Sequence, residues 1–126
     1  MKTLHFILKL IAWPLEPKEF TVKKVRTYHS TRYNKDITPR VGFKCDGSSC
    51  SPNVGWGWLF HDWLFWWGKF DDGTPCTWRQ ANRIMKDVMQ DEGWPKFVVY
   101  AYRKGIKSKH SLKAWKKHRA QDEDKH

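Results

Sequence analysis

Apolar and polar positions alternate loosely in two early segments of the chain. Residues 3–11 and 19–29 both show this alternation, and the second segment is rich in β-branched and aromatic side chains. Such patterns are typical of strands, and Pro14 and Pro17 favour a turn between them. A third short strand is expected over residues 38–44. The pattern therefore predicts a small antiparallel sheet near the N-terminus.

Residues 56–67 form a continuous apolar segment in which His61 and Asp62 are the only polar side chains. A helix that is apolar nearly all round is buried in a core, and Gly68 is suited to end it. Insertion into a membrane interface is the less favoured interpretation, because an interfacial helix needs a polar face. We expect a buried, Trp-rich helix.

Two to three further helices are predicted after this segment. Thr77 is suited to cap a helix whose apolar residues recur with helical spacing, and Gly93 is expected to close it. Pro95 is expected to begin the next helix, with Gly105 as its stop. A last helix over residues 112–120 is expected, capped by Ser111.

These elements predict an α+β fold, with a small N-terminal antiparallel sheet followed by three or four packed helices that include the buried His-Asp helix. A chain of 126 residues is within the range of one domain, and its nine Trp, seven Phe and four Tyr supply ample apolar area. We expect a single domain over residues 1–120 and a short charged tail over 121–126.

The formal charge of +11 is unevenly distributed. Residues 1–45 carry ten Lys/Arg and three acids, and residues 93–121 carry nine Lys/Arg and no acid, whereas residues 46–92 hold seven of the thirteen carboxylates. Basic flanks favour an acidic protein or nucleic acid as partner, although no base-reading motif is present. The expected contact residues are Arg103, Lys104, Lys107, Lys113, Lys116, Lys117 and Arg119.

The first twelve residues resemble a signal peptide only briefly. His5 and Lys9 interrupt their apolar run, and no small-residue cleavage site follows, so we expect no export by this route. No stretch approaches the ~20 apolar residues of a membrane span. In a chain that is not exported, Cys45, Cys50 and Cys76 are expected to stay reduced.

His61 and Asp62 need hydrogen-bond partners if their helix is buried. Adjacent helical residues point about 100° apart, so these two side chains cannot serve each other directly. Asp46 and Asn82 are the partners we expect. Two satisfied core groups are the simplest interpretation. The alternatives are hydrolytic chemistry at His61, Asp62 and Asn82, and calcium binding by Asp46 and Asp62, whose oxygens suit a hard cation; zinc lacks its ligand spacing.

An ordered series of motifs resembles a bacteriophage-associated family of unknown function. Residues 42–49 read Gly-Phe-Lys-Cys-Asp-Gly-Ser-Ser, with Pro52 after them, residues 61–65 read His-Asp-Trp-Leu-Phe, and Ala81-Asn82 and a later Gly105 and Trp115 complete the series. The resemblance covers roughly residues 40–115. It implies a phage-encoded protein in the virion or host cytoplasm and supplies no activity.

The His-Asp pair on a buried helix is also similar to secreted phospholipases A2. This resemblance implies that His61 would be the general base, that Asp62 and the loop around Asp46 would hold calcium, and that Asn82 would orient His61. The outline of the phage-associated family has Asp where this chain has Asn82, and phospholipases A2 are exported proteins rich in disulfides. This difference weighs against a fully active site.

From the sequence alone we expect a non-enzymatic, virion-associated structural or assembly protein that binds other phage proteins or nucleic acid through its basic flanks, and a membrane surface is the less favoured partner. The alternative is a hydrolase of phospholipase A2 type, with calcium as the cofactor it would use. The two differ in the site around His61: an open cavity favours chemistry, and a closed site favours architecture.

Overall fold

The computed structural model describes residues 19–46 and 55–125. It has an α+β fold in which two two-stranded antiparallel sheets precede four helices, as predicted. The strands are β1 (Glu19–Thr21), β2 (Tyr28–Ser30), β3 (Lys35–Ile37) and β4 (Lys44–Asp46), and the helices are α2 (Gly57–Trp67), α3 (Trp78–Asp91), α4 (Lys96–Ile106) and α5 (Lys109–Ala120). A 3-10 helix, Asp122–Lys125, follows α5.

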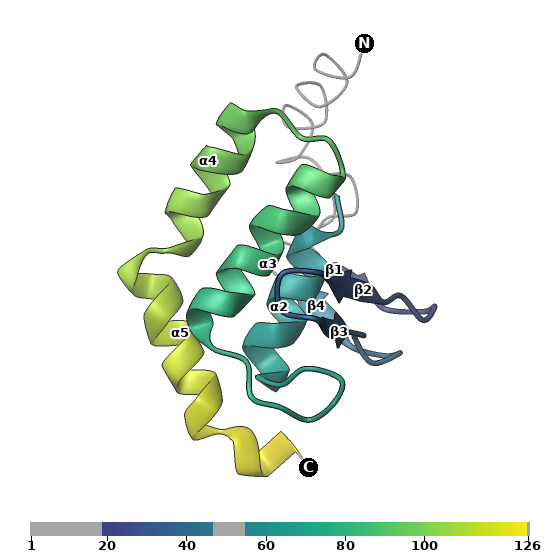
Figure 1. Ribbon diagram of the computed structural model, residues 1–126. Coiled ribbons are helices and arrows are strands. Elements are labelled where there is room, and N and C mark those ends of the chain that lie inside the picture. The colour runs from purple at the N-terminus through teal and green to yellow at the C-terminus, as the bar shows by residue number, and fades with distance from the viewer. Residues whose placement is uncertain (1–18, 47–54, 126) are drawn as a thin grey trace.

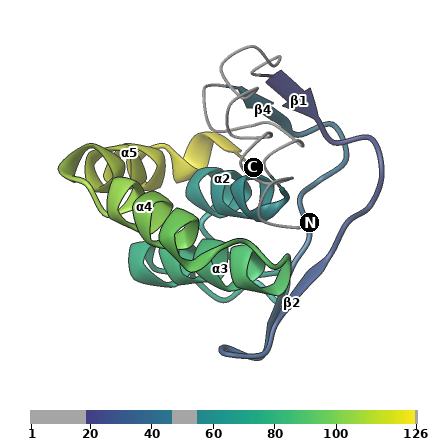
Figure 2. The ribbon, with the colours of Figure 1, turned by 90° about the horizontal axis from the view of Figure 1, so that it is seen from above.

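The helices lie to one side of the strands (Figure 1, Figure 2). Helix α2 packs along α3 and also contacts α5, while α4 lies against α3 (Figure 1). Seen from above, α4 and α5 lie on the side of α2 and α3 that faces away from the strands (Figure 2). Helix α2 is therefore enclosed by other elements, which agrees with its nearly continuous apolar sequence.

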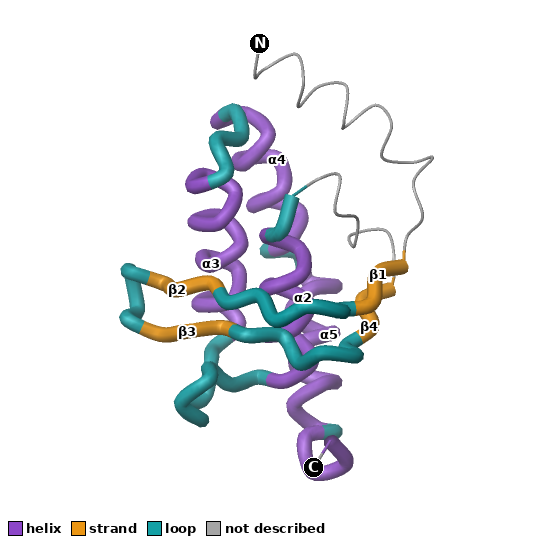
Figure 3. Tube along the Cα trace, turned by 90° about the vertical axis from the view of Figure 1, so that its right-hand side faces the viewer, coloured by secondary structure: helices purple, strands orange, loops and turns teal. Residues whose placement is uncertain are grey.

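The strands form two separate antiparallel pairs rather than one sheet (Figure 3). Strands β1 and β4 pair with Phe20 opposite Cys45, and β2 and β3 pair with His29 opposite Asp36. The predicted strand 19–29 is thus divided between both pairs. The predicted strand 38–44 is wrong, because Pro39 has no N–H to donate and a turn closes with the Phe43 N–H bonded to the Arg40 carbonyl. The predicted strand 3–11 lies outside the described residues.

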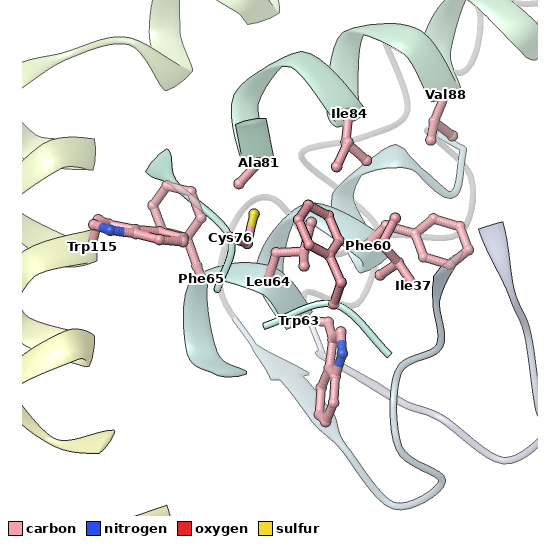
Figure 4. Close-up of a cluster of buried hydrophobic side chains, with 11 residues drawn as sticks. Ile37, Phe60, Trp63, Leu64, Phe65, Cys76, Ala81, Ile84, Val88 and Trp115 are labelled. Carbon is pink, nitrogen blue, oxygen red and sulfur yellow. The ribbon is translucent and has the colours of Figure 1, made fainter. Parts of the chain in front are cut away.

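The core is built between α2 and α3 (Figure 4). Leu64 of α2 and Ile84 of α3 are fully buried, and Phe65 meets the Trp115 ring of α5 edge to face with centroids 5.1 Å apart. Eight of the eleven residues of α2 are buried. The prediction that this helix lies inside the protein is confirmed, and Gly68 ends it with φ of 76°, in the left-handed region.

The caps of the later helices agree with the sequence in part. Thr77 caps α3 in a capping box with Gln80, as its side chain predicted. The expected stop at Gly105 is wrong: α4 continues to Ile106, whose burial outweighs the ~1 kcal/mol that glycine costs in a helix. Ser108, not Ser111, caps α5.

Candidate functional site

His61 lies in the middle of α2 and is 5% exposed. Its Nε2 is 2.9 Å from Oδ1 of Asn82, which is on α3 and 3% exposed. Asn82 was predicted as a hydrogen-bond partner in this buried site, and its bond to His61 confirms that prediction. His61 and Asn82 meet because each lies on the buried face of its helix, and these faces of α2 and α3 pack against each other.

The bond to Asn82 defines the tautomer of the imidazole. An amide oxygen can only accept, so Nε2 of His61 carries a proton, and in the neutral imidazole Nδ1 is then the nitrogen with the lone pair. Nδ1 has no hydrogen-bond partner within the described residues. The Phe65 ring lies 4.3 Å from the imidazole, centroid to centroid, and the Trp58 ring meets it edge-on at 6.2 Å. His61 is thus held in one orientation, and its Nδ1 is buried without a hydrogen-bond partner among the described residues.

Asp62 is beside His61 but partly open to solvent, with 27% of its side chain exposed. Its Oδ1 is 3.9 Å from Nδ1 of His61, beyond hydrogen-bonding distance, as expected for neighbours on a helix. Its Oδ2 is 2.9 Å from Sγ of Cys45 on β4. Cys45 is disulfide-bonded and Cys76 is a free buried thiol, so the expectation that all cysteines stay reduced is wrong for Cys45.

A pocket of about 350 Å³ opens beside the imidazole. His61 and Asp62 line one side with Trp58 and Phe65, and α4 and the start of α5 form the other wall. Residues of that wall are Ala101, Tyr102, Gly105, Ile106 and Ser111. The site thus combines one imidazole and one carboxylate with mostly apolar surroundings, which is typical of small-molecule sites.

The α4 wall was missed by the sequence analysis. Ala101 and Gly105 are four residues apart, so they lie on the same face of α4, and their small side chains leave space opposite His61. The spacing of these two small residues was the available signal. It was overlooked because Gly105 was interpreted as the end of the helix rather than as part of its surface.

The calcium interpretation finds little support among the described side chains. No group of three His, Cys, Asp or Glu residues in the described segments is arranged to hold a metal ion. Asp62 is a single carboxylate at the pocket, and Asp46, the other expected ligand, belongs to β4 but its side chain is not described. We therefore assign no chemical step to calcium.

The expected basic contact residues divide into two groups. The exposed residues are Lys104 on α4, Lys107 between α4 and α5, and Lys113, Lys116 and Lys117 on α5, whereas Arg103 is half-buried. Arg119 is turned inward: its Nη2 donates to the carbonyls of Phe65 at 2.7 Å and Trp66 at 2.8 Å. A positive charge at the carbonyl end of α2 complements the helix dipole. Arg119 therefore stabilises the C-terminal end of α2 and is not part of the exposed basic surface.

The tail is also tied to α2. Lys125 Nζ donates to the carbonyl oxygens of Trp66 and His118 and pairs with Asp122 at 3.1 Å. The end of the described chain is thus attached to the helix that carries His61.

No family model, curated protein or solved structure matches this chain. Within the described residues, no helix has both the length and the apolar character needed to cross a membrane.

Proposed function

We propose that the pocket beside His61 is the active site of a hydrolase that cleaves an ester with an apolar portion. The observation that carries this proposal is the bond between Nε2 of His61 and Oδ1 of Asn82, because it leaves Nδ1 of a pocket-lining imidazole as the available base. The apolar walls of the pocket suit an acyl chain. The similarity to phospholipases A2 gives the imidazole the same role.

The reaction follows from the position of this base. Nδ1 of His61 takes a proton from water, and the water oxygen bonds to the carbonyl carbon of the ester. When the tetrahedral intermediate collapses, the bond from carbon to the alcohol oxygen breaks and His61 returns its proton to that oxygen. The products are a carboxylic acid and an alcohol, and the imidazole is restored.

Asn82 and Asp62 act on the imidazolium in different ways, one through orientation and the other through charge. Asn82 orients the ring but supplies no charge, and an Asp→Asn change in serine proteases costs about 10⁴ in rate. Asp62 supplies a negative charge 3.9 Å from Nδ1. At this separation the attraction is about 1 kcal/mol in water and about 4 kcal/mol at an effective dielectric constant of 20. We therefore expect a slow enzyme.

The test is release of fatty acid from mixed anionic phospholipid vesicles, with calcium or with a chelator. We expect slow release by the parent protein, faster release by Asn82→Asp and none by His61→Ala. The control is His29→Ala, which removes an exposed histidine bonded to Asp36 and should leave the rate unchanged. Absence of turnover in both the parent and Asn82→Asp, with both shown to be folded by circular dichroism, would refute the proposal.

A second candidate function is favoured by the exposed lysines of α4 and α5. In this proposal the chain is a phage-encoded assembly protein that binds an acidic partner protein or nucleic acid through that surface. Such binding should weaken steeply with added salt. Reversing Lys104, Lys107, Lys113, Lys116 and Lys117 to Glu should release the folded protein from its assembly, and unchanged incorporation of this variant would exclude the surface.

A further inference from the structure

A second pocket, of about 360 Å³, lies between α3 and α4. Four of its six lining residues are cationic and none is acidic: Arg79 and Arg83 come from α3, Arg103 comes from α4, and Lys107 directly follows α4. The two remaining residues are Trp78 and Asn82. A concave surface with four positive charges and no carboxylate is complementary to an anion.

The four cations of this pocket have no ion pair among the described residues. Other basic side chains in the described chain have a carboxylate partner: Arg32 pairs with Asp87 at 2.9 Å, and Lys35 pairs with Asp72 at 2.5 Å. Desolvation and the nearby positive charges, Arg103 foremost among them, lower the pKa of Lys107. The cations repel one another, and an anion among them would relieve that repulsion.

Asn82 supplies an independent indication of a ligand. It is 3% exposed, and its Oδ1 already accepts a hydrogen bond from His61. Its Nδ2 amide has no hydrogen-bond partner in the described part of the chain. Asn82 also lines the pocket, and Nδ2 is the end of its amide that is not bonded to His61. A buried donor without a partner is costly, and a bound acceptor would satisfy it.

Trp78 gives this pocket a fixed wall. Its indole Nε1 donates to Oγ of Ser111 on α5 at 3.0 Å, which holds the ring in place. The pocket therefore presents guanidinium groups, one ammonium group and one neutral amide donor around a restricted volume. Guanidinium groups match the oxygens of phosphate with paired hydrogen bonds, and a phosphate also accepts from a neutral N–H.

We propose that the pocket between α3 and α4 binds a phosphate group, with Asn82 Nδ2 and the guanidinium groups of Arg83 and Arg103 as its donors. The volume is at the lower end of the ~300–1,000 Å³ range of ligand pockets, so the phosphate is either free or carried on a small organic group. The proposal does not depend on hydrolysis at His61. Asn82 nevertheless joins the two sites, since one end of its amide contacts His61 and the other faces the phosphate.

The first test is calorimetric titration of the full chain with inorganic phosphate and with glycerol phosphate at constant ionic strength. Tighter binding of glycerol phosphate would assign an organic phosphate, and equal affinities would assign free phosphate. Each charge-assisted hydrogen bond removed should weaken binding about tenfold. The variant Arg83→Gln/Arg103→Gln should therefore bind about a hundredfold more weakly. The variant Arg79→Gln/Lys107→Gln removes the other two charges of the pocket and should weaken binding less, because these side chains are not among the proposed donors.

The matched control is Lys113→Gln/Lys116→Gln, which removes the same charge from exposed positions on α5. It should bind phosphate as the parent does. Equal weakening in this control would mean that net charge alone attracts phosphate, and it would overturn the proposal. Nitrogen-15 spectra of the Asn82 amide and the His61 ring should also shift on titration with phosphate, and unchanged signals at saturating phosphate would overturn it too.

Discussion

Replacing Trp63 with Ala tests the claim that α2 is the buried centre of the fold. Trp63 is 4% exposed, and its ring meets Phe43 edge to face at 5.1 Å and lies 5.5 Å from Trp66 and 5.9 Å from Trp67, between ring centroids. Truncating a buried aromatic residue costs about 3–5 kcal/mol. Each lost aromatic pair contributes about 0.5–1.5 kcal/mol to this total. We therefore expect the upper part of that range.

The assay is urea denaturation followed by far-ultraviolet circular dichroism, together with thermal melting. A loss of 3–5 kcal/mol should lower Tm by about 10–20 °C in a domain of this size. The control is Phe97→Ala, an aromatic truncation at a residue that is 61% exposed, which should change stability by less than about 0.5 kcal/mol. If Trp63→Ala melts with the parent, the reasoning about α2 is wrong.

Further predictions concern three residues, Arg119, Gly68 and Cys76. Arg119→Met should cost about 1–3 kcal/mol, because it removes the side-chain donor to the Phe65 carbonyl and leaves Lys125 as the side-chain donor to the Trp66 carbonyl, whereas the exposed control Lys116→Met should be neutral in the same urea assay. Gly68→Ala should also destabilise, since a Cβ there would lie 1.8 Å from Arg119 Nη1, and an unchanged Tm would contradict that contact. Burial raises the pKa of the Cys76 thiol to about 12, so iodoacetamide at pH 8 should not label Cys76 in the folded chain. The unfolded chain releases this proton from about pH 9 while the folded chain keeps it, so the free energy of unfolding should fall as pH rises from about 9 to 12, and less so in Cys76→Ala.

The helices could be predicted because their signals are local. The apolar run of α2, the left-handed glycine after it and the capping box at Thr77 each depend on residues within one or two turns. The strands depend on partners distant in sequence: β1 pairs with β4, and the segment after Val22 leaves that pair to form β2. Alternation alone could not show which partner each segment would take.

Only one part of the candidate site could be predicted from the sequence, namely the hydrogen-bond partner of the buried His61. The requirement that a buried His61 be hydrogen-bonded led to Asn82, and the structure has that bond. The pocket and its α4 wall were not predictable, because they depend on how α4 packs against α2 and α3, and packing of Ile106 overrides the local preference of Gly105 to end a helix. The inward turn of Arg119 likewise follows from tertiary contacts that a run of basic residues does not reveal.

The most direct test of the proposed site is the tautomer of His61, measured by long-range proton–nitrogen correlation spectra of the labelled chain at alkaline pH. The account predicts a proton on Nε2, bonded to Asn82 Oδ1, and an Nδ1 with the chemical shift of an unprotonated ring nitrogen. Asn82→Asp should keep this pattern, and His29→Ala should identify the His29 signals by their loss. A proton on Nδ1 would contradict the account, because Asn82 would then be the donor to His61 and no base would be available at the pocket.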